Sequence, residues 1–240
     1  MEVRDGFIVG ISNYCDRWCE TCALTSRCRL FADTAEVEAT LDPGMKVLLD
    51  APPLPREGPP PLPWTREMVD EMNEASLSGV ATAALPPPRP VPPEHLAIEA
   101  RADDYFTGAH TWLRGRAYPA GDAGDPCAVI AWFHLQIVVK VHRAIRGLSE
   151  DDPRDRDWPA DHDGSAKVAL LGIDRSHAAW LEAVDRGLAT DAEAAPLIAD
   201  LVWLGEALER VFPRARAFVR PGLDEPDEVS TLLAREAGTR

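Results

Sequence analysis

The chain has 240 residues, of which 45% are hydrophobic, so it can form one large globular domain or a domain with a small module. Its formal net charge of -15 argues against a nucleic-acid-binding protein, because such a protein presents a basic surface to phosphate. The same charge argues against adsorption to anionic membrane surfaces.

The N-terminal residues, MEVRDGFIVGISNYC, lack the basic start and the long apolar core of a signal peptide. The longest apolar run, residues 127–141, contains His134 and Gln136 and is too short to span a bilayer. We therefore expect a cytoplasmic protein without a membrane partner. In that reducing compartment, clustered cysteines indicate metal or redox chemistry rather than structural disulfides.

Residues 1–50 are predicted to form a small irregular module around the cysteines. Within it, residues 7–12, FIVGIS, fit a short strand or an extended lead-in. The polar residues between the cysteines favour a loop with at most one helical turn. Residues 34–41 predict a short helix with Asp33 as its N-cap.

Residues 51–93 hold most of the 22 prolines of the chain and are predicted to be a connector. Proline breaks helices and removes a hydrogen-bond donor, so the two proline-rich runs should be extended. Between them, residues 65–77 predict one short helix.

Residues 94–213 are predicted to form an antiparallel four-helix-type bundle, which makes the fold class mainly α. The first two helices are expected over 94–113 and over 126–147. The second has the clearer start, with Asp125 as its N-cap and Pro126 at the first helical position. Because it is apolar nearly all round, it should be the most buried helix.

The third helix is expected over residues 163–186, and the fourth follows Thr190. In the sequence T-D-A-E, Thr190 and Glu193 have the spacing of a capping box. Pro196 either kinks this helix or marks its true start. Residues 214–240 are then a C-terminal tail with a short helix beginning near Pro226.

The strongest chemical signal is a group of four cysteines spaced C-x3-C-x2-C-x5-C. These predicted metal ligands are Cys15, Cys19, Cys22 and Cys28. Both zinc and iron–sulfur clusters are bound by four thiolates. The unequal spacing favours a [4Fe–4S] cluster, because structural zinc sites more often use two separated C-x2-C pairs. Zinc is the alternative cofactor, and free thiols or disulfides are a third possibility.

Nearby side chains are predicted to support such a centre. Aromatic rings of Tyr14, Trp18 and Phe31 should shield it from water. The guanidinium groups of Arg17, Arg27 and Arg29 should offset the charge of the thiolates.

The first three cysteines also resemble the C-x3-C-x2-C motif of the radical S-adenosylmethionine enzymes. That resemblance implies a [4Fe–4S] cluster on Cys15, Cys19 and Cys22 with one iron open to the cofactor. The sequence departs from the family at Thr21, where an aromatic residue is usual. Cys28 adds a fourth thiolate, and the remaining chain lacks the strand–helix alternation of a barrel.

Three longer stretches, NYCDRWCETC, DGSAKVALLGIDRSHAAW and FVRPGLDE, resemble a family of uncharacterised bacterial proteins. The members share an N-terminal four-cysteine motif and a helical C-terminal region. The resemblance covers most of the chain outside the proline-rich part and implies no particular activity.

A second set of polar residues lies on the two middle helices of the predicted bundle. The predicted pocket residues are Gln136, Lys140, Arg143, Lys167, Asp174 and His177. Charges on such apolar helices should be paired, so we expect Lys140 or Arg143 to contact Asp174 across the bundle. The pair either fixes the helix register or lines a pocket for a small anionic ligand.

Asp174 and His177 also form a D-x-x-H pattern, which is similar to the E-x-x-H of di-iron four-helix proteins. Only one such pattern is present, which favours ordinary hydrogen-bonded residues over a second metal site.

Taken together, the sequence predicts a metal-binding protein that acts in electron transfer or redox sensing with a protein redox partner. The alternative is a structural zinc module on a helical domain that binds a ligand or another protein. The sequence does not decide whether the protein is an enzyme.

Overall fold

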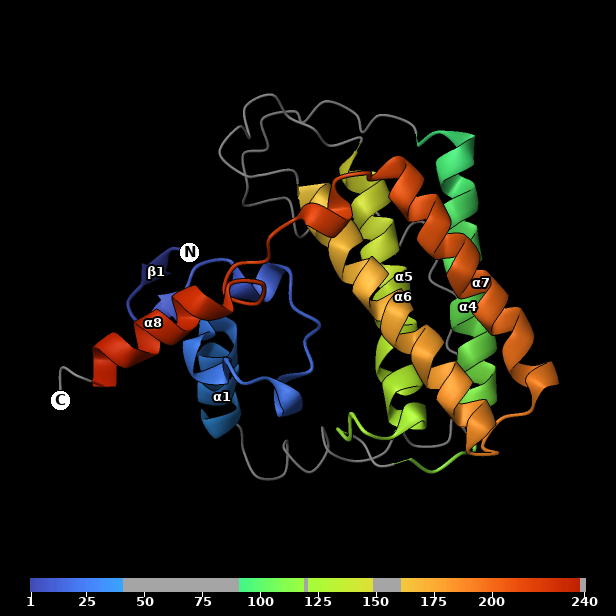
Figure 1. Ribbon diagram of the computed structural model, residues 1–240, viewed down its shortest axis with the longest axis horizontal. Helices are drawn as coiled ribbons and strands as arrows, with labels where there is room; N and C mark the ends of the chain where they lie inside the picture. The colour runs from blue at the N-terminus through green and yellow to red at the C-terminus, as the bar shows by residue number, and fades with distance from the viewer. Residues whose placement is uncertain (41–90, 119–120, 149–160, 238–240) are drawn as a thin grey trace, which may run out of the picture. The chain divides into compact units, whose positions relative to one another are not determined.

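The computed structural model describes residues 1–40, 91–118, 121–148 and 161–237 (Figure 1). The chain divides into two compact units, one made of Met1–Ala35 with Arg89–Arg240 and the other of Glu36–Pro88. The predicted proline-rich connector and its short helix fall outside the described residues, apart from Val91–Pro93. Everything below concerns the first unit, unless α1 is named.

The described chain is mainly helical, as predicted, with one small two-stranded sheet. The elements are β1 (Val3–Arg4), β2 (Phe7–Ile8), three 3-10 turns (Ile11–Asn13, Cys19–Thr21, Thr25–Arg27), α1 (Arg29–Thr40), α4 (Pro93–Leu113), α5 (Pro126–Gly147), α6 (Asp161–Asp185), α7 (Asp191–Val211), a fourth 3-10 turn (Ala215–Ala217) and α8 (Pro226–Ala237).

The four long helices α4 to α7, here called the helical body, follow one another in alternating directions (Figure 1). Helix α5 packs against α4 and α6, while α7 packs against α6 and α4. The predicted bounds of these helices agree with the structure to within two residues at nearly every end. Their apolar faces meet in one continuous core that includes Ile130, Phe133 and Leu204, each at most 1% exposed.

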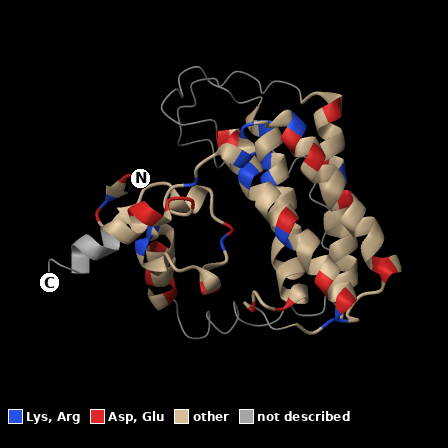
Figure 2. Cartoon of the chain, in the orientation of Figure 1, with Lys and Arg blue, Asp and Glu red and all other residues tan. Residues whose placement is uncertain are grey.

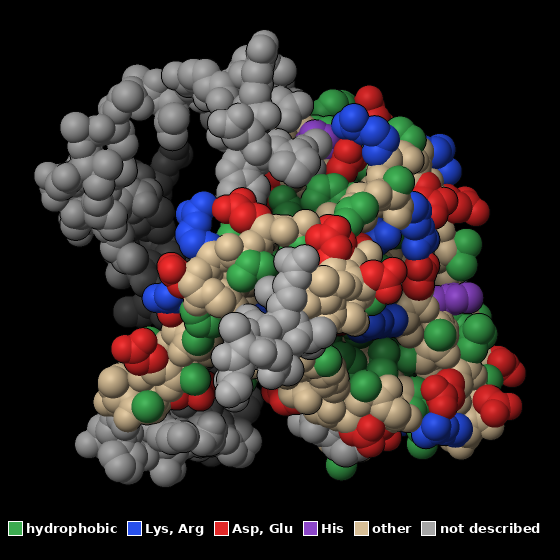
Figure 3. Space-filling view, turned by 60° about the vertical axis from the view of Figure 1, so that its left-hand side comes forward, with side chains coloured by type: hydrophobic (Ala, Val, Ile, Leu, Met, Phe, Trp, Pro, Cys, Tyr) green, Lys and Arg blue, Asp and Glu red, His purple; other side chains and the backbone are tan. Residues whose placement is uncertain are grey.

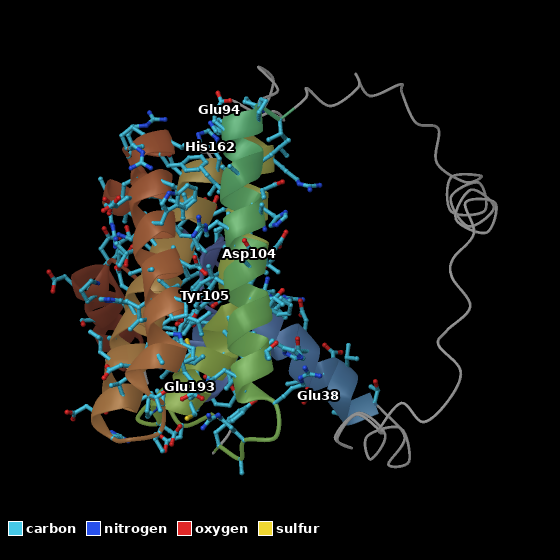
Figure 4. All side chains as sticks on the ribbon, turned by 90° about the vertical axis from the view of Figure 1, so that its right-hand side faces the viewer. Glu38, Glu94, Asp104, Tyr105, His162 and Glu193 are labelled. Carbon is cyan, nitrogen blue, oxygen red and sulfur yellow. The ribbon has the colours of Figure 1, made fainter. Side chains whose placement is uncertain are left out.

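The centre of this core holds a buried aromatic group with one internal hydrogen bond. Trp180 of α6 donates from its indole nitrogen to the Tyr105 hydroxyl at 3.2 Å. Tyr105 projects from α4 into the space between the helices (Figure 4). Burial raises the pKa of Tyr105 to about 12, so the hydroxyl stays protonated. The Trp112 ring meets Trp180 edge-on, with centroids 4.6 Å apart.

The helix ends follow the predicted local signals. The Asp125 carboxylate accepts from the backbone N–H of Ala128 at 3.0 Å and caps α5. Thr190 and Glu193 form the predicted capping box at the start of α7. Pro196 lies inside α7 and does not mark its start, which is at Asp191.

Within the described residues, α5 is the one helix long and apolar enough to cross a membrane by length and composition. Half of its apolar window is buried inside the structure. On the face seen in Figure 3, hydrophobic side chains lie scattered among acidic and basic ones.

Residues 1–28, here called the cysteine segment, contain the small sheet and three short 3-10 turns. The strands are antiparallel, with Val3 opposite Ile8. Asp5 and Gly6 both have positive φ, at 51° and 83°, as a two-residue hairpin turn requires. The predicted strand at residues 7–12 is therefore shorter than expected and gives way to a 3-10 turn.

The segment has little core of its own. Its buried apolar cluster contains Ile8 and Ile11 together with Val229 of α8. Helix α1 begins at Arg29, not at Thr34 as predicted, and Asp33 is no N-cap but an ion-pair partner of Arg29 at 2.7 Å. Leu30 and Phe31 are thus part of the helix, which starts directly after Cys28. No residue of α1 is buried.

Candidate metal centre

The four predicted ligands line one small pocket. Its wall is formed by Ile11, Cys15, Asp16, Arg17, Trp18, Cys19, Cys22, Thr25, Cys28, Phe31 and Leu223. The four thiols are half-buried, and none is in a disulfide. The space open to the centres of water-sized spheres is about 20 Å³, which is room for roughly one water.

Two tight turns direct the thiols toward this pocket. The backbone N–H of Cys22 bonds to the Cys19 carbonyl at 3.2 Å, and the N–H of Cys28 bonds to the Thr25 carbonyl at 3.1 Å. The N–H of Leu24 donates to the Cys22 sulfur at 3.4 Å. A backbone N–H directed at a sulfur is a common outer contact of thiolate ligands in metal sites.

Burial and neighbouring negative groups disfavour ionisation of the thiols in the pocket when no cation is bound there. Burial raises the pKa of Cys15, and the nearby Cys28 raises it further. Burial is also the main reason that the pKa of Cys19 is raised, followed by repulsion from the other three sulfurs. The ionised forms of the four thiols therefore disfavour one another across the pocket.

The chemistry of the wall fits a four-thiolate centre. Trp18, Phe31 and Leu223 supply apolar cover, and Arg17 supplies a positive charge. The Trp18 indole N–H is buried without an acceptor in the part of the chain that the structure describes. Such an orphaned donor fits a site that receives sulfur ligands or sulfide.

The geometry is not that of a preformed single-ion site. Among the described residues, no group of three or more His, Cys, Asp or Glu side chains is arranged to hold a metal ion. The four thiols therefore surround a common pocket without converging on one point.

Two of the predicted supporting roles are not observed. Tyr14 is buried against α6 and is absent from the pocket wall. Arg29 pairs with Asp33, and Arg27 donates to the Gly6 carbonyl at 3.2 Å. Of the three predicted arginines, only Arg17 lines the pocket.

Asp16 and Trp18 fix one side of the cysteine segment to the helical body. The Trp18 ring stacks on Trp132 of α5, with centroids 5.3 Å apart, and meets Phe133 edge-on. Trp132 donates from its indole nitrogen to the Asp16 carbonyl at 2.8 Å. Arg175 of α6 binds the Asp16 carboxylate at 2.7 Å.

Tyr14 fixes the other side. Its hydroxyl donates to Asp161 at 3.0 Å, and its ring meets Phe218 edge-on with centroids 4.8 Å apart. The ring lies directly over Gly164 of α6, where an added Cβ would overlap it and would lie 2.9 Å from Phe218 Cζ. Glycine is thus required at position 164 for the segment to approach the helix.

The C-terminal tail completes the enclosure. Leu223 lines the pocket, and Gly222 has φ 71° and lies against Ile8 of the cysteine segment. The cysteine segment and the tail thus both supply the pocket wall, while α6 contacts the segment through Gly164 and Arg175.

The six residues of the predicted polar pocket do not form one site. Gln136, Lys140 and Arg143 line a pocket on α5, whereas Lys167 and Asp174 of α6 both contact Arg216. His177 is half-buried on α6 and lines none of the pockets described here.

The predicted pairing of Lys140 or Arg143 with Asp174 is wrong. Arg143 binds Asp161, and Lys140 donates to the Asn13 carbonyl at 3.0 Å. Asp174 is exposed and pairs with Arg216 from the tail. The sequence pattern missed these partners because they lie outside the helix faces that it compared, in Asn13, at the start of α6 and in the tail.

The carboxylate–histidine pattern has no metal-site geometry in the described residues. Asp174 is held by Arg216. His134 of α5 packs beside both Phe106 and His110 of α4, with centroids 5.1 and 5.8 Å away. Cys127, the fifth cysteine, is buried in the first turn of α5 as a small core residue.

No family model, no curated protein and no solved structure matches this chain significantly.

Proposed function

We propose that Cys15, Cys19, Cys22 and Cys28 bind one iron–sulfur cluster, and that this cytoplasmic protein acts in electron transfer or redox sensing with a protein partner. The observation that carries the proposal is that all four thiols line one pocket with apolar cover and an uncommitted indole N–H. A bound cluster of this type supplies reversible one-electron chemistry.

The residues of the chain have separate tasks in this proposal. Trp18, Phe31 and Leu223 exclude water from the sulfurs, which are otherwise half-buried. The Leu24 N–H stabilises the Cys22 thiolate, and Arg17 offsets part of the negative charge. Phe31 is 40% exposed on α1, so it can swing outward to make room at little cost.

The placement of the thiols favours a cluster over an ion. Zinc requires every sulfur at about 2.3 Å from one point. A cluster spreads its iron corners, so its ligand sulfurs stand farther apart. Four thiols that line one pocket are compatible with that wider arrangement.

The scaffold, in this proposal, is an antiparallel four-helix bundle made of α4 to α7. Its role is to hold the cysteine segment through Trp132, Arg175 and Gly164. A rigid support of this kind keeps the thiols in place while an electron arrives or leaves.

The alternative is a structural zinc ion that fastens the cysteine segment to the bundle, which would then bind a ligand or another protein. The narrow space of about 20 Å³ and the small core of the segment support this alternative. A segment with so few buried residues depends on a metal for stability more than the bundle does.

The test is anaerobic purification of the full chain, followed by iron, zinc and acid-labile sulfide analysis and visible absorption. We expect iron and sulfide with visible charge-transfer bands in the wild type and loss of both in Cys19→Ser. The matched control is Cys127→Ser, which removes a thiol outside the pocket and should leave the metal content unchanged.

Detection of one equivalent of zinc without sulfide would favour the structural zinc ion over the iron–sulfur cluster. A wild-type protein without bound metal after anaerobic purification and after reconstitution with iron, sulfide or zinc would refute both.

A further inference from the structure

A second pocket lies beside the cysteine pocket, on the other side of Asp16 and Arg17. Both residues belong to the walls of both pockets. The remaining wall comes from α5, as Ala131, Trp132, His134, Leu135, Gln136, Val139, Lys140 and Arg143. Its volume of about 480 Å³ is in the range of small-molecule sites.

One end of this pocket carries positive charge in a protein of net charge -15. Lys and Arg residues are concentrated near the end at which α5 stops and α6 begins (Figure 2). Lys140 is only 7% exposed, and its ammonium group donates to the Asn13 carbonyl. Within the described residues, neither Lys140 nor Arg17 has an ion-pair partner, whereas Arg143 is bound by Asp161 at 2.9 Å.

A buried cation without a counter-charge is costly, and the structure shows that cost at Lys140. Burial is the main reason that the pKa of this ammonium group is lowered, followed by repulsion from Arg143 and Arg17. Arg17 has φ 59°, a left-handed conformation that residues other than glycine seldom adopt. Unpaired charge and backbone strain at one place are typical of ligand sites.

The rest of the pocket is apolar. Leu135 and Val139 are 53% and 52% exposed, although they lie one turn apart on the most apolar helix of the chain. Trp132 adds an aromatic surface, held in place by Trp18 and Asp16. The Gln136 side-chain oxygen is buried and has no hydrogen-bond partner in the described chain.

We propose that this pocket binds a small amphipathic carboxylate, with its anionic head at Lys140 and Arg17 and its apolar body along Trp132, Leu135 and Val139. The two unpaired cations match a carboxylate head. A phosphate is less suited, because it is usually cradled by the free N–H groups of a helix start, and this pocket lies along the middle of α5. The inference shares Arg17 with the proposed metal centre, whereas Lys140 and the apolar wall belong to this pocket alone.

The probe is decanoate, titrated into the full-length protein by isothermal calorimetry at a concentration below micelle formation. We expect saturable one-site binding with a Kd below about 1 mM. Decanol and inorganic phosphate, which supply the apolar body and the anion separately, should each bind at least tenfold more weakly.

Two variants test the assignment. Lys140→Met keeps the apolar stem and removes the charge, and it should weaken decanoate binding at least about tenfold. Val139→Asp changes a half-exposed surface position, so the fold is retained, and its carboxylate should repel the ligand with a similar loss. Arg210→Gln, an exposed residue on α7, is the control and should bind decanoate as the wild type does.

The proposal would be overturned if decanoate showed no saturable binding with a Kd below about 1 mM. It would also be overturned if Val139→Asp bound decanoate as tightly as the wild type. Equal binding of decanol would show an apolar groove without an anion site. Binding to anionic vesicles but not to free decanoate, or dimerisation that Val139→Asp abolishes, would assign the surface to a membrane or to a second copy. Metal content, measured on the same samples, separates failure here from failure of the metal centre.

Discussion

The helical body and the cysteine segment are stabilised in different ways. The body buries long apolar faces from four helices in one continuous core. The segment buries Ile8 and Ile11 with Val229 and is otherwise held by contacts to the body through Tyr14, Asp16 and Trp18. Packing is therefore the main source of stability in the body, whereas the segment depends on its contacts to the body and, in our proposal, on a metal.

The largest expected effect comes from the centre of the body. Trp180→Ala removes a fully buried ring and its hydrogen bond to Tyr105, so it should lower the free energy of unfolding by about 3–5 kcal/mol. Urea denaturation followed by circular dichroism measures it. Leu181→Ala, at a neighbouring position that is 52% exposed, should change stability by less than about 1 kcal/mol. Similar losses in both variants would contradict a packed core here.

The contact between the two regions should give the next effect. Gly164→Ala places a methyl group in the Tyr14 ring, so we expect a loss of about 1–3 kcal/mol and faster amide exchange in residues 11–28. The matched control is Gly205→Ala on α7, where an added Cβ would lie 3.7 Å from Ile173. It should be neutral or stabilise the protein by up to about 1 kcal/mol. A harmless Gly164→Ala would mean that the segment is not docked as described.

A smaller effect is expected at the start of α7. Thr190→Ala removes the side chain that accepts from the Glu193 N–H, and it should destabilise the protein by about 1 kcal/mol. The loss belongs to the body alone, so exchange in the cysteine segment should stay as in the wild type. Hydrogen exchange with mass spectrometry measures both regions in one experiment. A change confined to the cysteine segment would contradict the separate stabilisation of the two regions.

The smallest effect concerns pH. Burial lowers the pKa of His134, with repulsion from His110 adding to it and a hydrogen bond to the Ala131 carbonyl opposing it. Because the pKa of His134 is lower in the folded protein, the unfolded chain binds a proton more readily. The free energy of unfolding therefore decreases as the pH falls below about 6.5. His134→Phe should reduce this loss between neutral and mildly acidic pH in urea titrations. An unchanged pH dependence would assign the loss to other groups.

Much of the body could be predicted from sequence because its signals are local. Asp125–Pro126 and the Thr190–Glu193 pair fix helix starts through contacts within one turn. The start of α1 was missed because Leu30 and Phe31 lack a cap that can be recognised, and Asp33 looked like one. At residues 7–12 the sequence predicts a short strand or a lead-in, and the pairing of β2 with β1 was missed although Asp5–Gly6 is a turn signal.

The candidate sites also differ in how far the sequence could predict them, depending on whether their residues are neighbours in the chain. The four cysteines could be grouped because they are neighbours in the sequence, and the structure places them around one pocket. Charge pairs across the fold could not be assigned, since the partner of Asp174 is Arg216 and the partner of Arg143 is Asp161. The roles of Asp16 and Trp132 as a shared anchor had no sequence signal at all.

The anchors of the cysteine segment also bear on the order of events during synthesis. Tyr14 and Asp161 are 147 positions apart, and Asp16 and Arg175 are 159 apart. Contacts between residues so far apart in the sequence form late, after the local helices have formed. The cysteines, in contrast, lie within one short stretch and can gather as soon as they leave the ribosome. A metal therefore has access to all four thiols well before α6 is available to receive them.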